Sequence, residues 1–171
     1  MLHRPCHLCH PENVQIYVLR HAIAEEAKAG QPDSDRRLTA EGKQKLLRIL
    51  ECARKTGVRP DVMLSSPYQR AMETAEMARD TLRLTDRILQ TDVLTPGYTP
   101  ERVWDEIRLH RDAAQVMVAG HEPQLSSLVY FLCGGRVEMK KGALARIDVD
   151  SLGPRPTGVL VWLLTAKLAN A

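Results

Sequence analysis

Two histidines in this sequence each follow directly after a short run of aliphatic residues. His21 follows Val18-Leu19-Arg20, and His121 follows Met117-Val118-Ala119-Gly120. Such runs are typical of strands buried on both faces of a parallel sheet. Ligand sites in open α/β sheets form at the carboxyl ends of the strands, so we expect the two imidazoles to face one site. The arginine beside His21 indicates that the ligand is an anion.

A second arginine is expected at the same edge of the sheet. Ser66 is predicted to cap a helix that Pro67 opens, which places Arg70 in the first turn. Backbone N–H groups and the helix dipole favour an anion at that position. The guanidinium groups of Arg20 and Arg70 also match phosphate oxygens in a bidentate way. We therefore expect the site to bind a phosphoryl group.

The charges around His21 predict its chemical role. Neighbouring cations and partial burial both disfavour imidazolium, so His21 should be neutral and able to attack phosphorus. The arginines and His121 would then stabilise charge on the phosphoryl oxygens during transfer. Because fixed cations supply that charge, and the sequence contains no P-loop or magnesium-type carboxylate cluster, we predict no metal and no cofactor.

Strand and helix patterns alternate along the chain. Helices are predicted from Thr39 to Gly57, from Pro67, from Pro100, and from Pro123 to Gly134. Strands are predicted at 14–19, 62–64, 88–93, 114–119, 144–149 and 159–164. The last two have no helix between them and can pair as a hairpin. This order predicts a three-layer α/β/α sandwich with a mostly parallel sheet and an antiparallel C-terminal contribution.

The whole-chain numbers are those of an ordinary globular protein. The chain has 171 residues, of which 44% are hydrophobic and 26% are charged, and its net charge is +3. That charge is too small to indicate binding to nucleic acid or to an acidic membrane surface. No apolar run approaches the length of a membrane span, and the N-terminus has no secretory pattern. We expect one domain over residues 14–171, a cytoplasmic location, and a loose tail over residues 1–13.

That tail contains Cys6-His7-Leu8-Cys9-His10, which matches the C-x-x-C-H pattern of haem attachment. The haem interpretation requires export, and no export signal is present. Zinc is a second possibility because the ligand spacing is suitable, but no matching second pair follows in the sequence. A loose tail is the interpretation that we favour.

Four ordered motifs resemble those of the histidine phosphatase superfamily. Leu19-Arg20-His21-Ala22 resembles the family's "RHG" signature, with alanine in place of glycine. Ser65-Ser66-Pro67-Tyr68-Gln69-Arg70-Ala71-Met72-Glu73-Thr74-Ala75 matches "SSPxxRAxxTA". Leu38-Thr39-Ala40-Glu41-Gly42 and Gly120-His121-Glu122-Pro123 match two further segments. The short length and the style of the motifs are most similar to the SixA-type phosphohistidine phosphatases.

The resemblance implies His21 as the nucleophile, Arg20 and Arg70 as phosphate ligands, and His121 as the second imidazole of the pocket. The substituted Ala22 should be tolerated if its backbone has negative φ. The general acid is open. Glu122 is the first candidate, against the alternative that it only caps the helix near Pro123.

Glu25 or Glu26 is the second candidate for the acid, and no acid at all is the third possibility. An acid is dispensable when the leaving group is an imidazole. The resemblance also implies a transient protein partner, a histidine phosphotransfer domain of a two-component relay, whose phosphohistidine would be the substrate. The alternatives are a phosphatase for small phosphate esters and a phosphate-binding sensor without turnover.

Overall fold

The computed structural model describes residues 13–170 of the chain. Within them the strands are β1 (Val14–Arg20), β2 (Val62–Ser65), β3 (Ile88–Gln90), β4 (Gln115–Gly120), β5 (Leu144–Val149) and β6 (Gly158–Leu164). The α-helices are α1 (Ala40–Lys55), α2 (Gln69–Leu82), α3 (Pro100–Ile107) and α4 (Gln124–Cys133). Single 3-10 turns are η1 (Asp33–Asp35), η2 (Asp92–Leu94), η3 (Arg108–His110) and η4 (Leu168–Asn170).

The strands form one sheet in the order β3-β2-β4-β1-β5-β6. The first four strands in this order are parallel, whereas β5 is antiparallel to β1 and β6 is antiparallel to β5. The C-terminal strands therefore pair as neighbours, as the missing helix between them predicts.

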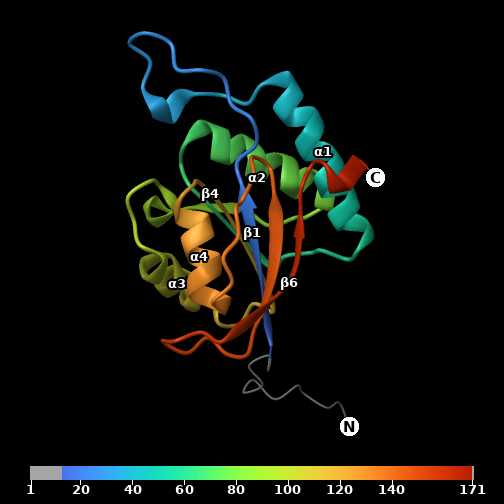
Figure 1. Ribbon diagram of the computed structural model, residues 1–171, viewed down its shortest axis with the longest axis vertical. Helices are drawn as coiled ribbons and strands as arrows, with labels where there is room; N and C mark the ends of the chain where they lie inside the picture. The colour runs from blue at the N-terminus through green and yellow to red at the C-terminus, as the bar shows by residue number, and fades with distance from the viewer. Residues whose placement is uncertain (1–12, 171) are drawn as a thin grey trace.

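Helices cover both faces of the sheet, with α1 and α2 on one side and α3 and α4 on the other (Figure 1). Two apolar clusters fill the spaces between these layers. Trp104 and Leu128 belong to the cluster beneath α3 and α4, and Leu46 and Leu50 belong to the cluster beneath α1. Alternate residues of β1, such as Val18 and Leu19, enter opposite clusters, because successive strand side chains point to opposite faces. The observed architecture is the predicted three-layer sandwich.

The start of α2 differs from the sequence-based prediction. Ser66 does not cap this helix and Pro67 is not its first residue, because α2 begins at Gln69 with Tyr68 in the N-cap position. The Ser66 hydroxyl instead contacts an imidazole, as described below, and is not free to cap the helix. The shift is small, so Arg70 still lies in the first turn of α2.

The expectations for the N-terminal tail, including the cysteine and histidine motif, fall outside the described residues except at Asn13. Within residues 13–170, no helix combines the length and the apolar character required to cross a membrane.

The N-terminus of α1 packs directly against the segment that follows β1. Thr39 caps the helix, since its hydroxyl oxygen accepts from the backbone N–H of Gly42, and the Thr39 N–H donates to the carbonyl of Ile23 at 2.9 Å. A Cβ atom at Gly42 would lie 2.3 Å from the same Ile23 oxygen. Glycine is therefore required there by close approach, and the contact fixes the chain two residues beyond His21.

We expect Gly42→Ala to lower the stability of the fold, because the rigid backbone of Ile23 cannot move aside without displacing the chain beside His21. The expected cost is about 2 kcal/mol, the usual range for overpacking. That cost corresponds to a fall of about 4–8 °C in Tm for a domain of this size, measurable by thermal unfolding. Gly153→Ala is the matched control, since its nearest atom is a flexible serine hydroxyl at 3.4 Å. Equal Tm values for the two variants would contradict the packing argument.

Candidate active site

The register of the parallel strands brings the two predicted histidines together. Arg20 is the register partner of Gly120 across β1 and β4, so the residues that follow, His21 and His121, emerge side by side. The His21 N–H donates to the Gly120 carbonyl at 3.0 Å, and the two ring centroids lie 5.1 Å apart. The structure therefore brings the two predicted histidines together at one edge of the sheet.

His21 is held with one ring nitrogen free. Its Nδ1 lies 2.8 Å from the carbonyl oxygen of Ala22, which can only accept, so Nδ1 carries the proton and Nε2 keeps its lone pair. Burial lowers the pKa of His21 to about 4, against the opposing effect of the Ala22 hydrogen bond and with the help of Arg70, Arg20 and Lys141. At neutral pH the side chain is thus an unprotonated imidazole, as the surrounding charges predicted.

His121 has the opposite arrangement of its ring nitrogens. Its Nε2 lies 2.9 Å from the hydroxyl of Ser66, and the same hydroxyl oxygen accepts from the Tyr68 N–H at 3.3 Å. The Ser66 hydroxyl can donate its proton to Nε2, and we assign the bond in that direction, which places the ring proton on Nδ1. Burial, then His21 and Arg70, lower the pKa of His121 to about 3. His121 is therefore a neutral hydrogen-bond donor through Nδ1.

Arg20 is anchored by the turn that precedes β5. Its Nη1 donates to the carbonyl of Met139 at 2.6 Å. The same turn contacts the backbone around the nucleophile candidate, since Gly142 N–H donates to the His21 carbonyl and Arg20 N–H donates to Ala143. One end of the Arg20 guanidinium is thereby fixed, and its Nε is buried without a hydrogen-bond acceptor among residues 13–170.

Arg70 is anchored by the loop between β1 and α1. Its side chain is 5% exposed, and Nη1 and Nη2 donate to the main-chain oxygen and the carboxylate Oδ2 of Asp33 at 2.6 and 2.9 Å. Its Nε is also buried without an acceptor. The ring of Tyr68 packs against both Arg70 and His121. Its centroid lies 5.0 Å from the Arg70 guanidinium carbon and 5.1 Å from the His121 ring centroid.

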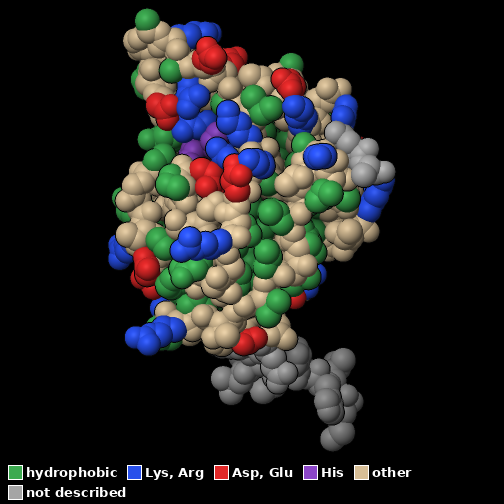
Figure 2. All heavy atoms as spheres, viewed as in Figure 1, with side chains coloured by type: hydrophobic (Ala, Val, Ile, Leu, Met, Phe, Trp, Pro, Cys, Tyr) green, Lys and Arg blue, Asp and Glu red, His purple; other side chains and the backbone are tan. Residues whose placement is uncertain are grey.

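Three buried N–H donors in this site have no acceptor in the described protein, namely Arg20 Nε, Arg70 Nε and His121 Nδ1. Buried donors are normally paired, so each such group requires an explanation. Both arginines act electrostatically on His21, and the His121 ring centroid lies 5.1 Å from that of His21, so the three donors belong to the same site as His21. Figure 2 shows histidine side chains among a cluster of Lys and Arg side chains at one end of the molecule. This arrangement can bind a tetrahedral anion next to a neutral nucleophile.

The three acid candidates lie in different settings. Glu122 accepts from the backbone N–H and the hydroxyl of Ser126 at 3.1 and 2.7 Å, which are the contacts expected of a residue that caps α4. Glu25 lies 4.0 Å from the ammonium of Lys28. Glu26 is exposed.

Two positioning residues were not assigned by the sequence-based reasoning. Ser66 contacts His121 through its hydroxyl. Thr74 links the segment after β1 to α2, because the Thr74 hydroxyl accepts from the Ala22 N–H at 3.1 Å and donates to the Arg70 carbonyl at 2.7 Å. Both belong to the motif around Arg70, which was the available signal. Ala22 itself is unstrained, since Arg83 is the one non-glycine residue with positive φ between residues 13 and 170.

The described part of the chain offers no group of three or more His, Cys, Asp or Glu side chains that could hold a metal ion. His21 and His121 therefore do not belong to such a group. The donors that the site presents are N–H groups, which suit an anion.

Comparison with known proteins agrees with the geometry. Residues 16–92, which contain most of β1, the loop after it and the whole of α2, match the family model of the histidine phosphatase superfamily (branch 1). A solved structure of the protein histidine phosphatase SixA complexed with tungstate matches with a TM-score of 0.82 and 25% identity over 90% of this chain and 98% of that one. The family model and the solved structure thus match the same superfamily, and the structural match extends over nine-tenths of this chain. Both matches support a phosphatase enzyme.

Two further proteins extend the comparison. A SixA structure from Agrobacterium tumefaciens has a TM-score of 0.79 and 24% identity, with 89% of this chain and 97% of that one covered. An uncharacterized protein of Picosynechococcus sp. is 24% identical over 136 residues, which cover 77% of this chain and 82% of that protein. The histidine phosphatase fold therefore extends well beyond the segment that the family model matches.

The lowered histidine pKa values predict a specific pH dependence of stability. Below pH 6.5 an unfolded histidine binds a proton that folded His121 refuses down to about pH 3, so the free energy of unfolding should fall as the pH drops through this window. His121→Asn should make this dependence shallower, although it lowers stability at pH 7. Chemical denaturation at pH 7 and pH 5 measures how steeply the free energy of unfolding changes with pH in wild type and in His121→Asn. His110→Asn controls for loss of a histidine outside the site, and parallel slopes for wild type and His121→Asn would refute the argument.

Proposed function

We propose that this enzyme removes the phosphoryl group from a protein phosphohistidine, with His21 as the nucleophile. The observation that carries the proposal is the set of three unpaired buried N–H donors in the site that holds His21, whose Nδ1 is bound to the Ala22 carbonyl. The partner would be a phosphorylated histidine phosphotransfer domain or another phosphohistidine protein, bound transiently in the cytoplasm.

The reaction has two steps. In the first, His21 Nε2 forms a bond to phosphorus while the P–N bond of the substrate breaks, and the departing imidazole nitrogen takes a proton from solvent. In the second, water attacks phosphorus and gives up a proton to solvent, the P–N bond breaks with its electron pair returning to Nε2, and inorganic phosphate leaves. Arg20, Arg70 and His121 Nδ1 donate to the phosphoryl oxygens throughout, and such preorganised donors in a buried site stabilise the charge of the transition state.

The carboxylates around the pocket support phosphohistidine over a phosphate ester. Glu122 is bound to Ser126 and Asp33 to Arg70, while Glu73 accepts from Arg37 and Leu38. The hydrogen bonds from the arginines and from the Leu38 N–H outweigh burial and hold the pKa values of Asp33 and Glu73 below their usual values, so these two carboxylates are poorly prepared to donate a proton. An alkoxide leaving group needs such a donor, whereas an imidazole is a far better leaving group.

The structural relatives support the same proposal. The protein histidine phosphatase SixA, which matches with the TM-score of 0.82 given above, is described as complexed with tungstate, a tetrahedral oxyanion of the phosphate type. The arrangement of cationic and neutral N–H donors in this chain suits an anion of that shape.

The first prediction from this proposal is that the enzyme dephosphorylates a phosphohistidine phosphotransfer domain faster than any of a panel of sugar and nucleotide phosphates. A rapid quench with ³²P-labelled substrate should trap label on the protein, and His21→Ala should abolish the label. His110→Ala, a histidine outside the pocket, is the control and should label normally.

If the enzyme hydrolyses the sugar and nucleotide phosphates but not the phosphohistidine protein, its substrates are small phosphate esters and the proposed substrate class is wrong. Stoichiometric phosphate binding with no covalent label would instead indicate a sensor. Normal labelling of His21→Ala would remove His21 from the role of nucleophile.

The second prediction concerns Glu122. Because its carboxylate caps α4 and the leaving group is an imidazole, Glu122→Gln should keep phosphohistidine turnover within about threefold of wild type, far less than general-acid catalysis contributes. Glu138→Gln is the matched control, since both carboxylates act electrostatically on Arg20. A loss of about a hundredfold in kcat for Glu122→Gln alone, the size of a general-acid contribution, would assign Glu122 as the proton donor.

A further inference from the structure

Asp33 contacts Arg70 at one end of the guanidinium group only. The main-chain oxygen of Asp33 accepts from Nη1, and its carboxylate Oδ2 accepts from Nη2. These two contacts occupy the end of the guanidinium that points away from its Nε. The edge formed by Nε and the remaining Nη2 proton is left for another acceptor, and Nε is buried without one.

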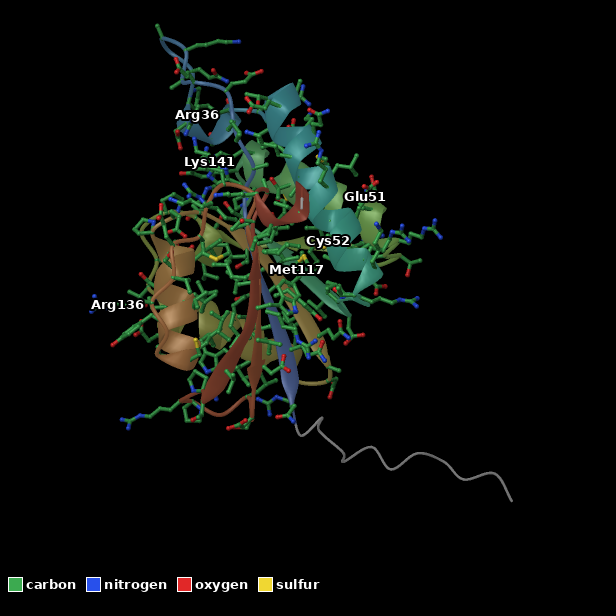
Figure 3. All side chains as sticks on the ribbon, turned by 45° about the vertical axis from the view of Figure 1, so that its right-hand side comes forward. Arg36, Glu51, Cys52, Met117, Arg136 and Lys141 are labelled. Atoms are coloured by element: carbon green, nitrogen blue, oxygen red, sulfur yellow. The ribbon has the colours of Figure 1, made fainter. Side chains whose placement is uncertain are left out.

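A second cation holds the Asp33 carboxylate from its other oxygen. Arg36 Nε and Nη2 both contact Oδ1, at 2.8 and 2.7 Å, and Arg36 Nη1 donates to the carbonyl of Glu25 at 3.0 Å. Asp33 is therefore shared between a buried arginine and an arginine on the rim, and Arg36 lies at the same end of the molecule as Lys141 (Figure 3). Burial opposes ionisation of Asp33, but the hydrogen bonds from Arg70 and Arg36 outweigh it and hold its pKa below the usual value.

The loop that carries Asp33 is itself tied to the helix that carries Arg70. Arg37 Nε donates to Glu73 at 2.6 Å, and the Leu38 N–H donates to the same carboxylate at 2.9 Å. Glu73 lies one helical turn after Arg70 on α2. The segment from Asp33 to Leu38 is thus attached to α2 at both of its ends, through Arg70 and through Glu73.

We propose that Asp33 is a positioning residue for the phosphoryl site, which holds Arg70 from behind so that its Nε edge faces the anion. This inference rests on the proposed function, because it assumes that the anion is the phosphoryl group. Without the Asp33 carboxylate, the Arg70 side chain would have to be ordered by substrate binding, which costs affinity and alignment. Asp33 acts through Arg70 and does not contact the reacting atoms.

The rival interpretation is that Asp33 occupies the place of the phosphoryl group and must be displaced. The two interpretations predict opposite effects on anion binding. If Asp33 positions Arg70, its truncation weakens the binding of phosphate. If Asp33 competes with substrate, its truncation strengthens binding.

The test is the affinity for inorganic phosphate, measured by calorimetry at pH 7, in wild type, Asp33→Ala and Asp33→Asn. Asn keeps a side-chain oxygen for Nη2 but removes the negative charge, so Asp33→Asn should bind phosphate at least as well as wild type. Asp33→Ala should bind about tenfold more weakly than Asp33→Asn, the effect of losing one hydrogen bond to a charged group. Asp35→Ala is the matched control on the same 3-10 turn, since its carboxylate contacts only Ser34.

A double-mutant cycle shows whether the effect passes through Arg70. In an Arg70→Ala background, Asp33→Ala should cause no further loss of phosphate affinity, because the positioned group is gone. Equal affinities for Asp33→Ala and Asp33→Asn, or tighter binding by Asp33→Ala than by wild type, would overturn the inference. Wild type that binds phosphate and forms the His21 adduct would in that case leave the proposed function intact. A wild type that neither binds phosphate nor forms the adduct would end both.

Discussion

The site depends on the in-register parallel pairing of β1 with β4. Because Arg20 faces Gly120 across the two strands, the next residue of each is an imidazole at the same edge of the sheet. The register of a buried parallel pair is specified by its apolar side chains, and a shift by one residue would turn every side chain to the opposite face. The separation of the histidines is therefore set by the hydrophobic core beneath them.

Charge balance is the second constraint. The core places two arginines and two imidazoles in a small volume, and the pKa values of His21 and His121 fall to about 4 and about 3, so both rings remain neutral. Because the rings are neutral, they do not add to the repulsion between the two arginines. The His21 ring keeps a lone pair on Nε2, and the His121 ring can donate a hydrogen bond through Nδ1. The unpaired donors still cost stability, and an anion that accepts from them recovers it. Ligand binding should thus be linked to folding at this edge of the sheet.

The sequence was sufficient for the parts of the site that stand on regular elements. The alternation of strands and helices predicted the layers, and the strand-end positions predicted the meeting of His21 and His121. It was insufficient where a short polar side chain had two possible partners, as at Ser66, which holds an imidazole and does not cap α2. Asp33 could not be predicted at all, because its contact with Arg70 depends on the path of an irregular loop.

The two kinds of support in this site, strand ends for the imidazoles and a loop for Arg70, differ in how freely they can vary. The imidazoles are oriented by the Ala22 carbonyl and by the buried Ser66 hydroxyl, and both residues lie within two positions of a strand end. Arg70 is oriented by a loop, and that loop is attached through Glu73 and through the close approach of Gly42 to Ile23. Loops tolerate substitution and insertion more readily than buried strands do. Changes in the β1–α1 loop can therefore alter the orientation of Arg70 while His21 stays where the sheet places it.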